Sequence, residues 1–150
     1  MTVPQLGFGT WTLKGDVAKE SVKCAIQAGY RLIDSAQGYG NEADVWAGVV
    51  ASGIPRNEVF ITTKIAPDVM REGTVRASID ASLAAFGGTY IDLLLIHWPV
   101  KGKLEDTWRM SETERSGRLA RATATRTTST RFWRWRPSAP SSTRMKSIPT

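Results

Sequence analysis

The stretch Ile91-Asp-Leu-Leu-Leu-Ile-His97 decides the fold, because it is a short and nearly continuous apolar run that ends on an ionisable residue. Two earlier stretches have the same form, Arg31-Leu-Ile-Asp34 and Val59-Phe-Ile-Thr-Thr-Lys64. Strands of a parallel sheet have this pattern when both of their faces are covered, since they then show no polar alternation. These stretches therefore predict three parallel strands, and a fourth is expected around residues 5–9.

Helical patterns separate the predicted strands. Asp16 is expected to cap a first helix that stops at Gly29, with an apolar face formed by Val17, Val22, Cys24, Ala25, Ile26 and Ala28. A second helix is expected from 41 or 42 to 52, and a third from about 71 to 86. A strand and a helix thus alternate with a period of roughly 30 residues, which is typical of a (β/α)8 barrel or a doubly wound sheet.

Polar residues follow the predicted strands at their carboxyl ends: Asp34 with Tyr39, then Lys64, then His97. Both parallel architectures form their binding sites at this edge of the sheet. Taken singly, each residue also has a structural explanation, since a lone histidine at a strand end is more often a hydrogen-bonded structural group. Three neighbouring strands that all end in this way predict one shared pocket.

Four motifs together resemble a known family: Gly7-Phe-Gly-Thr-Trp11, Asp34-Ser-Ala-Gln-Gly-Tyr-Gly-Asn-Glu42, Phe60-Ile-Thr-Thr-Lys64 and Tyr90-Ile-Asp-Leu-Leu-Leu-Ile-His-Trp-Pro99. Their order and spacing resemble the aldo-keto reductases, and in particular the bacterial branch that includes 2,5-diketo-gluconate reductases. The resemblance implies an α/β fold made of the first four βα units of a (β/α)8 TIM barrel. It also implies an NADPH-dependent oxidoreductase that reduces aldehydes or ketones to alcohols.

The same resemblance assigns a chemical role to each polar residue. Tyr39 would be the proton donor, and the Lys64 ammonium would favour the phenolate that remains, since a free phenol is a weak acid at neutral pH. Asp34 would pair with Lys64, and His97 would donate a hydrogen bond to the carbonyl oxygen as negative charge develops there. The expected partner is a small carbonyl substrate, and no metal is expected.

The resemblance also places the ligands. Thr10, Trp11 and Asp34 are expected at the cofactor, whereas Trp11, Trp98 and His97 are expected at the substrate pocket. Trp98 has an alternative, because a tryptophan before a proline can simply pack over a strand end. The family's other contacts to the nicotinamide and to the adenosine phosphate belong to the second half of the barrel, so the sequence leaves the activity of this chain open.

The length of 150 residues conflicts with a complete barrel, which takes about 250 residues. We therefore expect residues 1–115 to be the amino-terminal half of a reductase barrel and residues 116–150 to be an irregular basic tail. The net charge of +6 arises in this tail, since residues 115–150 contain nine Lys or Arg and no Asp or Glu. The preceding residues contain 11 basic and 14 acidic side chains.

The tail shows neither a helical nor a strand period, so it is expected to be disordered or out of frame. Its Arg131-Phe-Trp-Arg-Trp-Arg136 segment interleaves cations with rings. The alternative function is therefore a non-catalytic half-barrel whose tail binds nucleic acid or an anionic surface. We favour the hypothesis that residues 120–144 are barrel sequence read out of frame, because their composition is typical of displaced GC-rich codons, and nucleic acid is then not an expected partner.

The remaining composition favours a cytoplasmic protein. One cysteine, Cys24, allows no disulfide framework and fits a reducing compartment, where it would be a small core residue. No stretch is long and apolar enough for a membrane helix, and the first residues lack the pattern of a signal peptide. A half-barrel would have open edges at its first and fourth strands, which would allow self-association.

Overall fold

The computed structural model describes residues 3–113 of the chain. One sheet contains four parallel strands in chain order: β1 (Gly7–Gly9), β2 (Leu32–Asp34), β3 (Phe60–Ile65) and β4 (Leu93–Ile96). The helices are α1 (Gly15–Gln27), α2 (Glu42–Ala51), α3 (Pro67–Glu72), α4 (Val75–Ala85) and α5 (Leu104–Thr113), with short 3-10 helices η1 (Gln37–Tyr39) and η2 (Arg56–Glu58). The predicted alternation of parallel strands and helices is confirmed. The predicted tail, with its frame hypothesis, lies outside the described residues.

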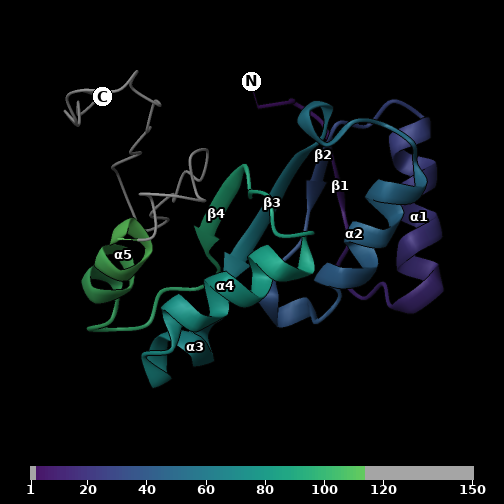
Figure 1. Ribbon diagram of the computed structural model, residues 1–150. Helices are drawn as coiled ribbons and strands as arrows, with labels where there is room; N and C mark the ends of the chain where they lie inside the picture. Colours follow the sequence, from purple (N-terminus) through teal and green to yellow (C-terminus); the bar gives the residue numbers. More distant parts are fainter. Residues whose placement is uncertain (1–2, 114–150) are drawn as a thin grey trace, which may run out of the picture.

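One face of the sheet forms the core. The register aligns Phe8, Ile33 and Ile61 across three strands, so their side chains point to the same side, and Ile33 and Ile61 are fully buried. The apolar sides of α1, α2 and α4 pack against this face through Val22, Ile26, Val45, Val49, Ile79 and Leu83. Figure 1 shows α1 and α2 side by side near β1 and β2, while α5 lies beyond β4.

The opposite face of the sheet is only partly covered. Leu32, Leu93 and Leu95 are half-buried there, although each lies within a strand. The prediction of strands covered on both faces, made for three of the strands, is therefore correct for β3 but wrong for β2 and β4. The reason is that the helices described cover one face, whereas the other face would be the inside of a barrel.

Helix α1 differs from its prediction at the start and on its apolar face. It begins at Gly15, with Lys14 and not Asp16 at the cap position. Val22, Ala25 and Ile26 are buried as predicted, but the side chains of Val17, Cys24 and Ala28 are exposed. Residues two positions apart on a helix do not share a face, so Cys24 cannot lie on the side that Val22 buries. Cys24 is therefore not a core residue.

The single helix predicted over about 71–86 is wrong. Two helices, α3 and α4, occupy this region, and Gly73 separates them with a left-handed φ of 75°. A glycine in this conformation commonly ends a helix, and Pro67 suits the first turn of the short helix before it. Helix α5 has no counterpart among the predicted elements. Within residues 3–113, no helix is both long enough and apolar enough to cross a membrane.

Candidate active site

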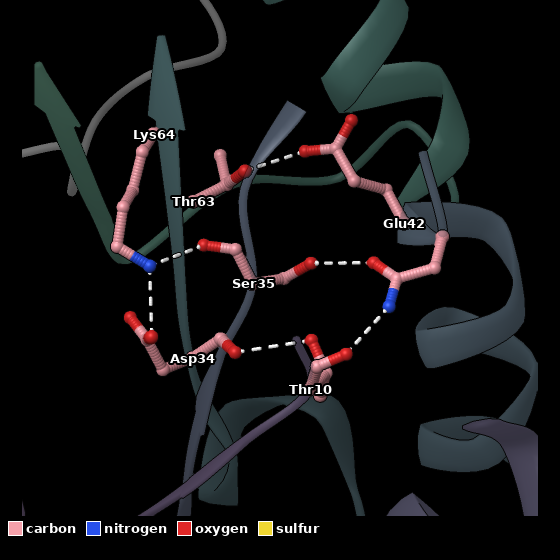
Figure 2. Close-up of polar contacts among 7 residues, drawn as sticks. Thr10, Asp34, Ser35, Glu42, Thr63 and Lys64 are labelled. Carbon is pink, nitrogen blue, oxygen red and sulfur yellow. Dashed lines mark hydrogen bonds and ion pairs between the residues drawn. The ribbon is translucent and has the colours of Figure 1, made fainter. Parts of the chain in front are cut away.

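Lys64 and Asp34 form an ion pair where β2 and β3 end. Lys64 Nζ lies 2.7 Å from Asp34 Oδ2 and donates a second hydrogen bond, of 2.8 Å, to the carbonyl oxygen of Ser35 (Figure 2). The register aligns Asp34 with Thr62, two residues before Lys64, so both ionic side chains point to the partly open face. The Lys64 side chain is only 14% exposed, whereas that of Asp34 is 38% exposed. Two acceptors therefore fix the ammonium at the rim of the sheet.

Tyr39 is brought to this ion pair by η1, the turn of 3-10 helix that follows β2. Lys64 Nζ lies 5.1 Å from the centre of the Tyr39 ring. The Tyr39 and His97 rings meet edge to face, with their centres 5.6 Å apart. The structure thus brings Asp34, Tyr39, Lys64 and His97 together at one edge, while their chemical roles remain predictions.

His97 follows β4 and continues its pairing with β3, because its backbone N–H donates to the carbonyl oxygen of Ile65 at 3.1 Å. Its ring stacks on that of Trp98, with centres 6.1 Å apart and planes 18° from parallel. Burial lowers the pKa of His97 below its ordinary value, and the nearby Lys64 charge lowers it further. The imidazole is therefore neutral at neutral pH, with one N–H to donate.

Thr10 and Trp11 follow β1 at the same edge. The buried Thr10 donates both its backbone N–H and its hydroxyl to the carbonyl oxygen of Asp34, at 3.0 and 3.1 Å. Trp11 is 72% exposed and Trp98 is 66% exposed, so both indoles are open to a ligand. The structure places Thr10 beside Asp34, and the assignments of all these residues to cofactor or substrate remain predictions.

Asn41 holds the segment after β1 in place through hydrogen bonds, a role that the sequence reasoning missed. Its side-chain amide is buried and donates to the carbonyl oxygens of Thr10 and Leu13, at 2.8 and 2.9 Å. Its side-chain oxygen accepts a hydrogen bond from the Ser35 hydroxyl at 3.1 Å. The available signal was its place in the quoted motif, two residues after Tyr39.

Glu42 forms a second network, partly buried, that the sequence reasoning missed. The hydroxyls of Thr63 and Ser82 donate to its two carboxylate oxygens, at 2.5 and 3.0 Å. Figure 2 shows that Thr63 reaches Glu42 on one side of β3 while its neighbour Lys64 reaches Asp34 on the other. Burial raises the pKa of Glu42, and the two hydrogen bonds oppose this effect. The carboxylate therefore supports the site from the helix-covered side of the sheet.

The sequence and the fold of this chain are similar to those of known proteins. Residues 5–125 match the sequence model of the Aldo/keto reductase family. The chain belongs to this family. As an aldo/keto reductase, it is 47% identical over 102 residues to methylglyoxal reductase DkgB from Salmonella typhi, and 44% identical over 111 residues to glyoxal reductase from Bacillus subtilis. These matches cover 68% and 73% of this chain but only 38% and 40% of those enzymes, so the chain spans about two fifths of their length.

Solved aldo/keto reductase structures share the fold. A reductase from Brucella melitensis superposes with a TM-score of 0.76 at 37% identity, over 85% of this chain and 51% of that one. A putative 2,5-diketo-D-gluconic acid reductase B superposes with a TM-score of 0.72 at 36% identity, over 81% of this chain and 44% of that one. The prediction of an incomplete (β/α)8 aldo-keto reductase fold is confirmed.

Proposed function

We propose that this chain carries the proton-donating side of a carbonyl reductase, which converts small aldehydes or ketones to alcohols. The observation that carries the proposal is the approach of Lys64 Nζ to within 5.1 Å of the Tyr39 ring centre, with Asp34 bonded to the same ammonium. A phenol beside a fixed cation is suited to donating a proton, because the cation stabilises the phenolate left behind.

The roles that the family resemblance assigns to the four residues are compatible with their arrangement. The carbonyl oxygen of the substrate binds between the Tyr39 hydroxyl and the His97 ring, on the two residues whose ring centres lie 5.6 Å apart. Tyr39 gives its proton to that oxygen, and the neutral His97 imidazole donates a hydrogen bond that orients it. Asp34 holds Lys64 in place through the 2.7 Å ion pair, so the positive charge is already oriented when the proton leaves.

The residues at the end of β1 are compatible with a nicotinamide ring. A Cβ built on Gly9 would meet no atom within 4 Å, and Gly9 aligns in register with Asp34. A flat ring therefore has room beside the partly exposed Asp34 carboxylate, where Trp11 and Asp34 would contact it and the buried Thr10 would hold Asp34 in position. NADPH, when bound, supplies the hydride for the carbonyl carbon. The choice of NADPH over NADH rests on the family resemblance.

A small dicarbonyl compound is the substrate class that we infer. Two relatives are named for methylglyoxal and glyoxal, and a solved structure is titled a putative 2,5-diketo-D-gluconic acid reductase B, and each of these names refers to a compound with two carbonyl groups. The exposed indole of Trp98 stacks on the His97 ring and would give the substrate an apolar wall, and the exposed indole of Trp11 follows β1 at the same edge of the sheet. The single cysteine, Cys24, fits the cytoplasm as the place of this reaction.

The test is methylglyoxal-dependent oxidation of NADPH by the purified 150-residue chain. We expect turnover that Tyr39→Phe lowers by a factor on the order of 100 or more, since the phenyl ring keeps the packing but has no proton to give. The matched control is Tyr30→Phe, because Tyr30 lies before β2 at the other end of the strand and contacts Phe8. Equal rates for wild type and Tyr39→Phe would refute the role of Tyr39. Absence of turnover in the wild type would refute the activity of this chain.

A further inference from the structure

The Gln37 side chain is tied to two other elements by both of its polar atoms. Its Oε1 accepts a hydrogen bond from the backbone N–H of Ala66, just after β3, at 3.1 Å. Its Nε2 donates toward the carbonyl and hydroxyl oxygens of Ser78, both at 3.2 Å, and the hydroxyl of Ser82, at 3.1 Å, all on α4. A residue of η1 is thus anchored to β3 and α4, which follow it by about 30 to 45 residues in the chain.

These contacts continue into the Glu42 network. The Ser82 hydroxyl accepts from Gln37 and donates to Glu42, and Glu42 in turn accepts from Thr63, the neighbour of Lys64 on β3. A chain of hydrogen bonds therefore joins the turn that carries Tyr39 to the strand that carries Lys64. Its Thr63–Glu42 end lies on the side of β3 away from the Asp34–Lys64 ion pair (Figure 2).

The turn needs such an anchor because a glycine flanks Tyr39 on each side. Gly38 and Gly40 are both exposed, and Gly40 has a left-handed φ of 59°. Glycine permits many backbone conformations, so these two positions do not by themselves fix the direction of the Tyr39 ring. The backbone N–H of Tyr39 donates to Ala36 at 2.9 Å, and the Lys14 ammonium donates to the carbonyl oxygens of Tyr39 and Gly40. The first of these bonds closes the turn and the Lys14 bonds tie it to the start of α1, but none of them connects it to β3.

We propose that Gln37 is a positioning residue, which sets the Tyr39 ring against His97 and Lys64 by anchoring η1 to β3 and α4. Its relevance to catalysis rests on the proposed function of Tyr39. Gln37 itself does not touch the reacting groups. Since a displacement of about 1 Å at a reacting group lowers turnover by roughly 100-fold, loss of this anchor has a measurable effect on the rate.

The first test is nuclear magnetic resonance of the 150-residue chain, which requires no activity. The variant is Gln37→Met, which keeps the length of the side chain and removes its hydrogen bonds. We expect the nuclear Overhauser contact between the Tyr39 and His97 rings to weaken or vanish, while the contact between the Phe8 and Tyr30 rings remains as an internal reference. The matched control is Gln27→Met, the same change at the exposed last residue of α1.

An unchanged Tyr39–His97 contact in Gln37→Met overturns the proposal. If both ring contacts vanish because the variant does not fold, Ser82→Ala decides, since it removes one anchor of Gln37 and places a good helix former in α4. Selective weakening of the Tyr39–His97 contact in Ser82→Ala supports the proposal, and no change overturns it.

The second test is steady-state kinetics of the same variants with methylglyoxal and NADPH. We expect kcat of Gln37→Met to fall by about 10- to 100-fold while KM changes by less than about twofold, because the displaced group acts in the transition state. An unchanged kcat beside a weakened ring contact overturns the link to catalysis. If wild type shows no turnover, the proposed function fails for this chain, and the ring contacts alone decide whether Gln37 positions Tyr39.

Discussion

At the scale of single residues, the site depends on two neighbours in β3 that face opposite ways. Thr63 is fully buried and donates a hydrogen bond to the Glu42 carboxylate, whereas Lys64 is partly exposed and donates to the Asp34 carboxylate and the Ser35 carbonyl oxygen. The Lys64 ammonium also lowers the pKa of His97, although burial is the larger cause of this shift. One lysine therefore adds to the effect of burial on the histidine while it faces the tyrosine.

The ionisation of His97 gives a direct prediction. His97 is the sole histidine of the sequence, so a single imidazole signal can be followed by nuclear magnetic resonance as pH changes. We expect it to titrate below 6.5, and Lys64→Met to raise its pKa by removing the repulsion and freeing the Asp34 carboxylate to attract the proton. Because the folded state binds this proton less readily than the unfolded chain, its contribution to stability is lost as pH falls below 6.5.

The matched control for this titration is Lys103→Met, which removes an exposed lysine beyond β4. We expect it to leave the His97 titration as in the wild type, because exposed charges are screened by solvent and salt. A His97 pKa that does not respond to Lys64→Met would show that the two groups are not coupled electrically.

At the scale of elements, the packing of α1 against α2 explains a glycine inside a helix. Glycine lowers helix stability by about 1 kcal/mol relative to alanine, so Gly48 in α2 needs another reason. A Cβ at this position would lie 2.5 Å from the carbonyl oxygen of Lys19 and 2.7 Å from the Cβ of Val22, both on α1. The two helices thus approach so closely that only a hydrogen atom fits between them.

Gly48→Ala is therefore expected to destabilise the fold in spite of its better helix propensity. We expect a loss of about 1–3 kcal/mol in the free energy of unfolding, because a backbone carbonyl must move to admit the methyl group. Denaturant unfolding measures it, with Val50→Ala on the exposed side of the same helix as the control, expected within about 0.5 kcal/mol of the wild type. A more stable Gly48→Ala protein would mean that the helices are not in such close contact.

Elements were predictable where the signal is local. The apolar runs around Ile33, Ile61 and Leu94 predicted three strands, because strands need only a few consecutive residues to show their character. The break at Gly73 was missed because a glycine within a helical pattern can be tolerated, and its left-handed φ is not visible in the sequence. The exposure of Cys24 was missed because Val22 and Cys24 were assigned to one apolar face, although residues two positions apart on a helix do not share a face.

The candidate site also contains residues that a local sequence pattern reveals and residues that it does not. Asp34, Lys64 and His97 could be chosen from the sequence because each ends an apolar run, and parallel strands end at one edge of a sheet. The anchoring by Gln37 could not, since its partners Ser78 and Ser82 lie about 40 residues away on a helix whose rotation no local pattern fixes.

At the scale of the whole molecule, the two ends of the sheet have different functions. The carboxyl end carries the candidate catalytic group, and the amino end carries a buried ion pair of Arg56 and Asp92, with 2.7 Å between Nη2 and Oδ2. The same Asp92 oxygen accepts from the backbone N–H of Ile61 at 2.9 Å, and the Arg56 guanidinium lies 4.0 Å from the Tyr90 ring centre. Among the described strands, β1 and β4 have a neighbour on one side only, and self-association through these edges stays a prediction.

Asp92→Ala tests this division. We expect a loss of about 3–5 kcal/mol in the free energy of unfolding, because the change leaves the Arg56 charge buried without its partner. The control is Asp68→Ala, in an exposed ion pair with Arg71 on α3, with an expected loss of about 0–1 kcal/mol. Under conditions where the variant remains folded, the Tyr39–His97 ring contact is expected to persist. A stable Asp92→Ala protein that loses this contact would contradict the separation of the two ends.

The opposite orientations of Thr63 and Lys64 have a consequence for how this strand can change during evolution. Deleting one residue from β3 before Thr63 would turn each side chain after it in the strand to the other face of the sheet. The Lys64 ammonium would then point into the helix-covered core, and the Thr63 hydroxyl would point to the partly open face. Substitutions at single positions alter one side of the sheet, whereas a length change alters both at once. We therefore expect natural variants of this chain to differ in the composition of β3 while keeping its length.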